Sequence, residues 1–201
     1  MKVVIGVNVK FKNIHLLQEL KTKYGCFIIA PKHQSELETL IFSMFLTSFR
    51  IVYKKEMNKI PVIGHYMRRM NFITIDRSDG KSAIQCLIQQ GQDSVINNTP
   101  VLIFPEGTRT LFGQRGHYHI GIALMYESMG VPILPVAHNA GECFVRNSFI
   151  KYPGTITFWL LPPILPGHPV RDVIAMIETC IESACDDLVE NKNLSNNQII
   201  C

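Results

Sequence analysis

The sequence predicts an α/β fold, a single domain with a mostly parallel central sheet flanked by helices. Short apolar, β-branched segments alternate with longer segments of helical periodicity, which is the pattern of strands joined by crossover helices. Several strand-like segments are followed directly by polar residues, where ligands bind to such sheets. The 201 residues suffice for one core. We expect the domain to cover residues 1–189, followed by a polar, disordered tail over residues 190–201.

The first expected elements are strands over residues 2–10 and 26–30, where β-branched and aromatic side chains dominate. Ser35 is a good N-cap for a helix over residues 36–49. That helix is apolar on all sides, so it is either buried in the core or in contact with lipid, and we favour the core. A short strand over residues 51–53 comes next, and Pro61 suits the first turn of a helix that reaches residue 70.

Five cationic side chains fall in and just before this helix: Lys54, Lys55, Lys59, Arg68 and Arg69. An ordinary solvated face would explain them, and so would a patch that faces lipid headgroups. The sequence leaves both interpretations open.

The rest of the chain repeats the alternation of strands and helices. Helical spacing of Ala83, Ile84, Leu87 and Ile88 supports the first helix of this half. We expect strands over residues 72–75, 101–104, 133–137 and 155–161, and helices over residues 81–92, 120–129 and 170–189.

His33 and Glu38 place an imidazole and a carboxylate at one expected strand-to-helix junction. A neutral histidine can take a proton from an alcohol, and a carboxylate on its other nitrogen fixes the tautomer and stabilises the imidazolium. Five helical residues turn through roughly 500°, so the two side chains can meet only if His33 precedes the first turn. A capping box, in which Glu38 bonds to the Ser35 backbone, is the competing interpretation.

Residues 104–109 read F-P-E-G-T-R, and residues 72–77 read F-I-T-I-D-R. Each is an apolar run that ends in an acid and a base. Gly107 allows close backbone approach of a ligand, and Arg109 offers a planar fork for phosphate. A further apolar run, residues 131–137, lies between prolines. His138, which follows it, is expected to be structural.

In this order and spacing, the blocks at residues 33–38, 72–77, 104–109 and 131–137 resemble those of the glycerolipid acyltransferase family, over about residues 25–144. The resemblance implies that His33 is the general base and that Glu38 stands where the family usually has Asp. It also implies that Glu38 supports His33, and that the acceptor's glycerol phosphate is bound by Lys54, Arg77, Glu106, Gly107, Thr108 and Arg109. At His119 many relatives carry a lysine.

The implied reaction transfers a fatty acyl group from acyl-CoA or acyl carrier protein to the sn-2 hydroxyl of 1-acyl-glycerol 3-phosphate, giving phosphatidic acid. The alternatives are acyl transfer to glycerol 3-phosphate or to another lysophospholipid, and a catalytically inactive phospholipid-binding module. The expected partners are a lysophospholipid acceptor, the acyl donor and a membrane surface. The reaction needs no cofactor.

Composition narrows the remaining possibilities. A net charge of +4 is too small to argue for nucleic acid but is compatible with an anionic membrane. The six cysteines lack zinc spacing and are expected to be reduced thiols, and His117 with His119 does not complete a metal site. No apolar run is long enough to span a bilayer. We expect a peripheral protein on the cytoplasmic face of a membrane.

Overall fold

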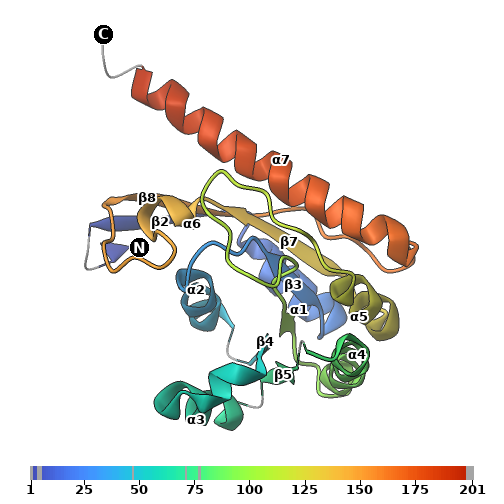
Figure 1. Cartoon of the computed structure of the whole chain (residues 1–201). Coiled ribbons are helices and arrows are strands. Elements are labelled where there is room, and N and C mark those ends of the chain that lie inside the picture. The colour runs from blue at the N-terminus through green and yellow to red at the C-terminus, as the bar shows by residue number, and fades with distance from the viewer. Residues whose placement is uncertain (1, 4–5, 47, 71, 77, 198–201) are drawn as a thin grey trace.

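The computed structural model describes residues 2–3, 6–46, 48–70, 72–76 and 78–197. Its eight strands form a sheet of order β1-β2-β8-β7-β3-β6-β4-β5 (Figure 1). The strands are β1 (Lys2–Val3), β2 (Val7–Lys12), β3 (Ile28–Pro31), β4 (Arg50–Lys54), β5 (Ile73–Ile75), β6 (Val101–Leu102), β7 (Ile133–His138) and β8 (Gly154–Leu160). The helices are α1 (His15–Tyr24), α2 (Leu37–Phe45), η1 (Lys55–Lys59), α3 (Pro61–Arg69), α4 (Gly80–Ile96), α5 (Gly121–Met129), α6 (Ala140–Cys143) and α7 (Val170–Asn197).

The centre of the sheet is parallel. β7, β3, β6, β4 and β5 are joined by parallel pairings. β8 is antiparallel to β7 and parallel to β2, and β1 closes the edge as an antiparallel partner of β2. These pairings confirm the predicted α/β class with a mostly parallel sheet.

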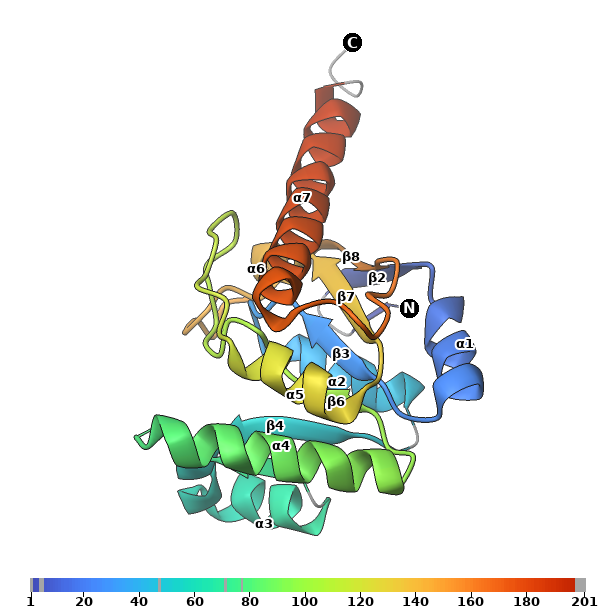
Figure 2. The ribbon, with the colours of Figure 1, turned by 90° about the vertical axis from the view of Figure 1, so that its right-hand side faces the viewer.

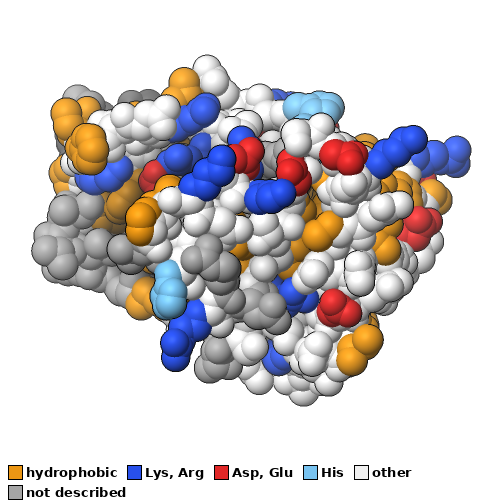
Figure 3. Space-filling model, turned by 60° about the horizontal axis from the view of Figure 1, so that its bottom comes forward, with side chains coloured by type: hydrophobic (Ala, Val, Ile, Leu, Met, Phe, Trp, Pro, Cys, Tyr) orange, Lys and Arg blue, Asp and Glu red, His pale blue; other side chains and the backbone are white. Residues whose placement is uncertain are grey.

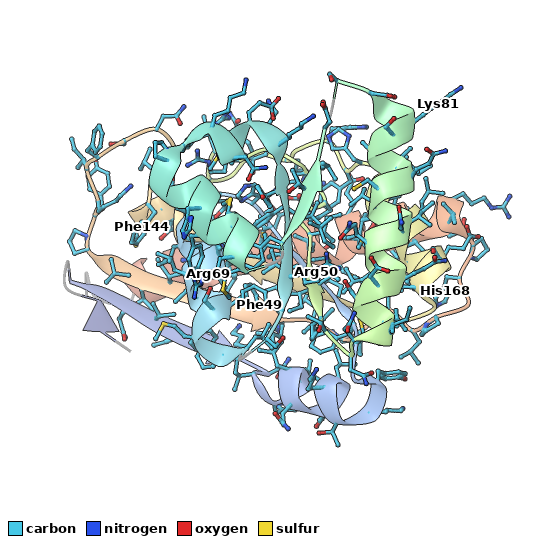
Figure 4. The ribbon with its side chains drawn as sticks, turned by 90° about the horizontal axis from the view of Figure 1, so that it is seen from below. Phe49, Arg50, Arg69, Lys81, Phe144 and His168 are labelled. Carbon is cyan, nitrogen blue, oxygen red and sulfur yellow. The ribbon has the colours of Figure 1, made fainter. Side chains whose placement is uncertain are left out.

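Helices cover both faces of the sheet (Figure 2). Alternation along β3 shows the division, because Ile28 packs into one hydrophobic cluster and Ile29 into the other. The first cluster contains side chains of α4, α5 and α7, and the second contains side chains of α1 and α2. Hydrogen bonds add to this packing. Arg50 (labelled in Figure 4), at the start of β4, donates to the Gln90 carbonyl and to the Ser94 hydroxyl of α4, both at 3.0 Å.

Several expected elements differ from those observed. The single strand expected over residues 2–10 is two strands, with Gly6 at a φ of 74° before β2. α1 was not predicted, although Leu17 and Leu20 form its buried face. α2 ends at Phe45 instead of residue 49, because Leu46 is extended and the chain turns toward β4.

Most of the polar segment that was expected to be a disordered tail is helical. α7 continues to Asn197, and residues 198–201 lie outside the described residues. Residues 190–197 contain neither glycine nor proline, so their polarity alone does not end the helix. The far end of α7 extends past the rest of the chain in both ribbon views (Figures 1 and 2).

Candidate active site

The parallel pairing brings the polar segments of the sequence to one edge of the sheet. Along the order β7-β3-β6-β4-β5, the strands lead into His138, His33, residues 104–109, Lys54 and Asp76, respectively. Carboxyl ends of parallel strands are where α/β proteins bind ligands. Segments up to about a hundred residues apart therefore contribute to a single candidate site.

His33 lies beyond the end of β3 and ahead of α2, which is the placement that its pairing with Glu38 requires. The ring stacks on Phe104, with centroids 3.7 Å apart and planes 19° from parallel. Its Nδ1 atom is 3.5 Å from Glu38 Oε2, and the His33 side chain is 19% exposed. That distance is long for a hydrogen bond, but catalytic hydrogen bonds often shorten only when substrate binds.

Glu38 makes both of the contacts that the sequence left open, the capping bond to the Ser35 backbone and the approach to His33. Its Oε1 atom accepts hydrogen bonds from the Ser35 amide at 2.7 Å, the Ser35 hydroxyl at 3.0 Å and the Gln34 amide at 3.2 Å. Its Oε2 atom faces His33. Burial raises the pKa of the Glu38 carboxyl, against the opposing effects of His138, Ser35 and Gln34. The local bonds to residues 34 and 35 thus hold one oxygen and direct the other toward the imidazole.

His138 is fully buried at the end of β7 and belongs to the same group of side chains. Its Nε2 atom is 2.8 Å from the Lys32 carbonyl oxygen and 3.4 Å from Glu38 Oε1. His138 directly follows the block at residues 131–137 and was expected to be structural, with no part in the site. The contact depends on the β3–β7 pairing, which the sequence does not specify.

A second buried cluster lies beside the first. The Lys32 ammonium donates to Glu182 Oε1 at 2.6 Å, to Glu106 Oε1 at 2.8 Å and to the Gln114 carbonyl at 3.1 Å. The Tyr118 hydroxyl donates to Glu182 Oε1 at 2.8 Å. Burial lowers the pKa of Lys32, but the hydrogen bonds that it donates to Glu106 and Glu182, together with the charges of these carboxylates, outweigh burial, so the pKa is raised overall. Neither Lys32 nor Glu182 was singled out from the sequence.

Glu106 points inward, away from the position expected of a substrate ligand. It is 1% exposed. Its Oε1 atom accepts from Lys32, and its Oε2 atom accepts from the His33 backbone amide at 2.8 Å. A Cβ atom on Gly116 would stand 2.4 Å from Glu106 Oε1, so the glycine there makes room for the carboxylate. The geometry gives Glu106 a supporting role beneath His33.

The other predicted phosphate ligands are more accessible. Arg109 pairs with Glu36 at the start of α2, and Thr108 is exposed beside it. Gly107 adopts a φ of 64° in the turn that its amide closes onto the Phe104 carbonyl, a conformation that favours glycine. Lys54 is half exposed and lies 3.3 Å from Glu56. Arg77 lies outside the described residues.

A hollow of about 290 Å³ lies next to the His33 loop. The loop is tied to its rim, because the Thr110 amide donates to the His33 carbonyl and the Gly141 amide to the Gln34 side chain. Most of the surface that lines the hollow is apolar, and an arginine is among the lining residues: Gln34, Thr110, Leu111, Phe112, Gly141, Glu142, Val145 and Arg146.

Among the other candidates, His119 contacts the 104–109 turn through its backbone, because its amide donates to the Pro105 carbonyl at 2.9 Å. The His117 and His119 rings meet edge to face at 4.9 Å, and nowhere in the described ranges do three or more possible ligands gather to hold a metal ion. Cys143 is a buried free thiol.

Comparison with known proteins identifies the family. Residues 8–139 match the Acyltransferase family. The chain belongs to this family. It is 37% identical over 155 residues to the 1-acyl-sn-glycerol-3-phosphate acyltransferase of Pseudomonas aeruginosa, covering 77% of this chain and 58% of that protein. It is 35% identical over 114 residues to the Helicobacter pylori protein of the same name, covering 56% and 48% of the two chains.

The crystal structure of the 1-acyl-sn-glycerophosphate acyltransferase PlsC from Thermotoga maritima has the same fold. The TM-score is 0.75 at 21% identity, over 92% of this chain and 73% of that one. The chain spans about half to three fifths of the length of the two bacterial relatives that it matches. Within the residues that the structure describes, no helix has the length and apolarity needed to cross a bilayer.

Proposed function

We propose that this acyltransferase transfers a fatty acyl group from a thioester donor to the sn-2 hydroxyl of 1-acyl-glycerol 3-phosphate, giving phosphatidic acid. The observation that carries the proposal is the partly exposed His33, backed by the buried Glu38, at a sheet edge that also presents Arg109 and Lys54. The names of the relatives support the same acceptor.

The reaction follows from this placement. Glu38 faces His33 Nδ1, so Nε2 is the nitrogen that takes the proton from the glycerol hydroxyl. The hydroxyl oxygen attacks the thioester carbonyl, the C–S bond breaks, and the proton returns from His33 to the departing thiolate. The ester forms in one transfer with no covalent enzyme intermediate, and Glu38 stabilises the imidazolium between the two proton movements.

The acceptor phosphate would be held by the cationic side chains of the same edge. Arg109 can present its guanidinium fork and Lys54 its ammonium, and Arg77, Thr108 and the Gly107 backbone complete the proposed set. Glu106 takes part indirectly, through the His33 amide. Binding energy from the phosphate would position the hydroxyl against the carbonyl.

The donor is acyl-CoA or acyl carrier protein, and no cofactor takes part in this chemistry. Leu111, Phe112 and Val145 make the hollow beside the His33 loop suitable for an apolar chain, and Arg146 adds a positive charge for a donor phosphate. The alternative acceptors, glycerol 3-phosphate and other lysophospholipids, require the same site chemistry and are separated by a substrate panel.

A peripheral contact with the cytoplasmic face of a membrane belongs to the proposal, since the acceptor's acyl chain enters from lipid. Exposed apolar side chains lie on α2 and around α3, namely Leu40, Met44, Phe45, Ile60, Tyr66 and Met70. Lys54, Lys55, Lys59 and Arg69 are exposed in the same region. Figure 3 shows a face on which hydrophobic and cationic side chains lie side by side. A protein that does not sediment with anionic vesicles would argue against this contact, and equal sedimentation with neutral and anionic vesicles would show that the cationic side chains do not contribute to it.

Thiol release from acyl-CoA, measured with and without 1-acyl-glycerol 3-phosphate, tests the function. We expect release that depends on the acceptor, and its loss in His33→Ala, with the far-ultraviolet circular dichroism unchanged. His168→Ala, which removes an exposed histidine outside the site, is the matched control and should retain turnover. Lipid binding by the wild-type protein without thiol release would favour the inactive binding module, and turnover by folded His33→Ala would exclude His33 as the base.

A further inference from the structure

We propose that His138 is a positioning residue of this site, which keeps Glu38 ionised and holds the segment on both sides of His33. The inference rests on the proposed function, because it concerns the carboxylate that supports the proposed base. It assigns a task to a buried side chain that the reaction itself does not use.

The hydrogen bonds of His138 define its tautomer. Nδ1 accepts a hydrogen bond from the Ala140 amide at 3.2 Å, so this nitrogen carries no proton in the neutral ring. The proton is then on Nε2, which lies 2.8 Å from the Lys32 carbonyl and 3.4 Å from Glu38 Oε1. The ring therefore presents an N–H toward two acceptors.

Those two acceptors flank His33 in the chain. The Lys32 carbonyl precedes it directly, and Glu38 lies in the first turn of α2. The other donors to Glu38 Oε1 are local, from Ser35 and Gln34, whereas His138 approaches from a different strand. Because a single N–H lies 2.8 Å from the Lys32 carbonyl, just beyond β3, and 3.4 Å from Glu38 Oε1, His138 couples the end of β3 to the orientation of the carboxylate.

The surroundings of His138 favour a neutral donor. Groups from four elements face it: Glu38 of α2, Lys32 and His33 beyond β3, Phe158 of β8 with its ring centroid 5.0 Å away, and Cys185 of α7, whose thiol lies 3.7 Å from the His138 carbonyl. Burial lowers the pKa of His138 overall; Glu38 and the hydrogen bond to the Lys32 carbonyl oppose this effect, and the His33 and Lys32 charges add to it. A neutral ring stabilises the Glu38 carboxylate through a dipole and leaves His33 as the group that gains a proton.

The loss of this N–H has a predictable sign. The carboxylate would be less well stabilised, so the His33–Glu38 pair would take up its first proton at higher pH, whichever of the two groups receives it. Turnover needs the unprotonated pair. The acid limb of the pH profile of kcat should therefore move to higher pH.

His138→Gln and His138→Asn form a matched pair for the test. The glutamine amide nitrogen can occupy the position of Nε2, whereas asparagine reaches only the position of Nδ1. In His138→Asn we expect kcat to fall several-fold, KM for both substrates to stay within about twofold, and the acid limb to move up by about half a pH unit or more. His138→Gln should restore most of kcat and the wild-type profile.

A measurement on the wild-type protein keeps the inference testable if His138→Asn does not fold. Nitrogen-15 NMR of the histidine side chains should show His138 neutral with its proton on Nε2 at neutral pH. A proton on Nδ1, or a His138 that becomes charged above pH ~6, would overturn the proposal. So would equal pH profiles in the folded asparagine and glutamine variants.

The same spectra separate this inference from the proposed function. If the wild-type protein released no thiol, the proposed function would be contradicted, but the titration of the His33–Glu38 pair in the two variants could still be compared. An upward shift in His138→Asn alone would support the positioning role, and unchanged titration in both would contradict it.

Discussion

Two clusters of buried ionisable side chains lie on opposite sides of the end of β3, and their hydrogen bonds differ. The lysine cluster, Lys32 with Glu106 and Glu182, is joined by hydrogen bonds of 2.6 and 2.8 Å. In the histidine cluster, His33 and His138 lie 3.5 and 3.4 Å from Glu38, and the His33 ring is partly exposed. The first cluster is closed around its charges, whereas the second includes a ring that is 19% exposed at the edge of the sheet.

The alternation of a strand explains the division. Side chains of consecutive extended residues point to opposite faces, so Lys32 reaches α7 through Glu182 while His33 turns toward α2 and Glu38. Glu106 joins the two clusters, since it accepts from the Lys32 ammonium and from the His33 amide. The lysine cluster thus holds the backbone of His33 in place, through the hydrogen bond from the His33 amide to Glu106.

Of the substitutions in the two clusters, removal of the Lys32 charge should have the largest effect on the stability of the protein. Lys32→Met leaves Glu106 and Glu182 buried without their cation, and we expect a loss of about 3–5 kcal/mol in the free energy of unfolding at pH 7. Urea denaturation measures it. The control is Lys81→Met, at an exposed lysine of α4 (Figure 4), which should change the free energy by less than about 0.5 kcal/mol. Similar values for the two variants would show that the lysine cluster is not a structural support.

Glu38→Gln should separate stability from activity. The amide keeps an acceptor for the Ser35 amide but cannot stabilise the His33 imidazolium, so we expect kcat to fall about a hundredfold or more. Burial raises the pKa of Glu38 in the folded state, so its contribution to stability is complete below the unfolded pKa and is lost as pH rises through the folded pKa. The variant has no such loss and should gain in stability relative to the wild type as pH rises above about 4.5.

Unfolding midpoints between pH 4 and pH 8 would measure that gain, with kcat followed in parallel. Glu19→Gln, at an exposed position of α1, is the matched control and should change neither the pH dependence nor kcat. A variant that keeps full turnover, or whose stability falls relative to the wild type as pH rises, would contradict the account of Glu38 as a buried carboxylate that stays ionised for function.

The two clusters also show how far the sequence could be interpreted. His33 and Glu38 were found because they lie five residues apart at a junction whose strand and helix signals are both strong. Lys32, Glu182 and His138 were not found, because their partners are 150 and 106 residues distant in the chain. Glu106 was expected to bind the acceptor because the resemblance to the acyltransferase family implies it, and the local sequence does not indicate that the side chain is buried. Its burial depends on Lys32, which nothing local connects to it.

The fold was predictable to a similar extent. Apolar segments of the parallel centre coincide with β3, β6 and β7 within a few residues, since buried strands are apolar throughout. α1 was missed because most of its residues are polar and only Leu17 and Leu20 are buried. The strand order, which brings His138 next to His33, comes from tertiary packing that local patterns do not encode.

Tyr118→Phe should have the smallest effect on the free energy of unfolding, and it tests whether the members of the lysine cluster are coupled. The hydroxyl donates to Glu182 Oε1, and burial, followed by Glu182 and Glu106, raises the pKa of Tyr118, so the donor persists throughout the accessible pH range. Hydrogen bonds to charged groups contribute about 1.5–3 kcal/mol. Tyr126→Phe is the control for bonds to neutral groups, because its hydroxyl donates to the Leu165 carbonyl at 2.7 Å and accepts from the His168 amide at 3.1 Å.

We therefore expect Tyr118→Phe to lower the free energy of unfolding by about 1–2 kcal/mol more than Tyr126→Phe does, as measured by urea denaturation. In the Lys32→Met background, where Glu182 has lost its cation, the cost of Tyr118→Phe should increase, because the hydroxyl is then one of the few groups that stabilise the carboxylate. Strict additivity of the two substitutions would mean that Tyr118 and Lys32 act on Glu182 independently, and that the cluster is a set of separate contacts rather than one coupled support.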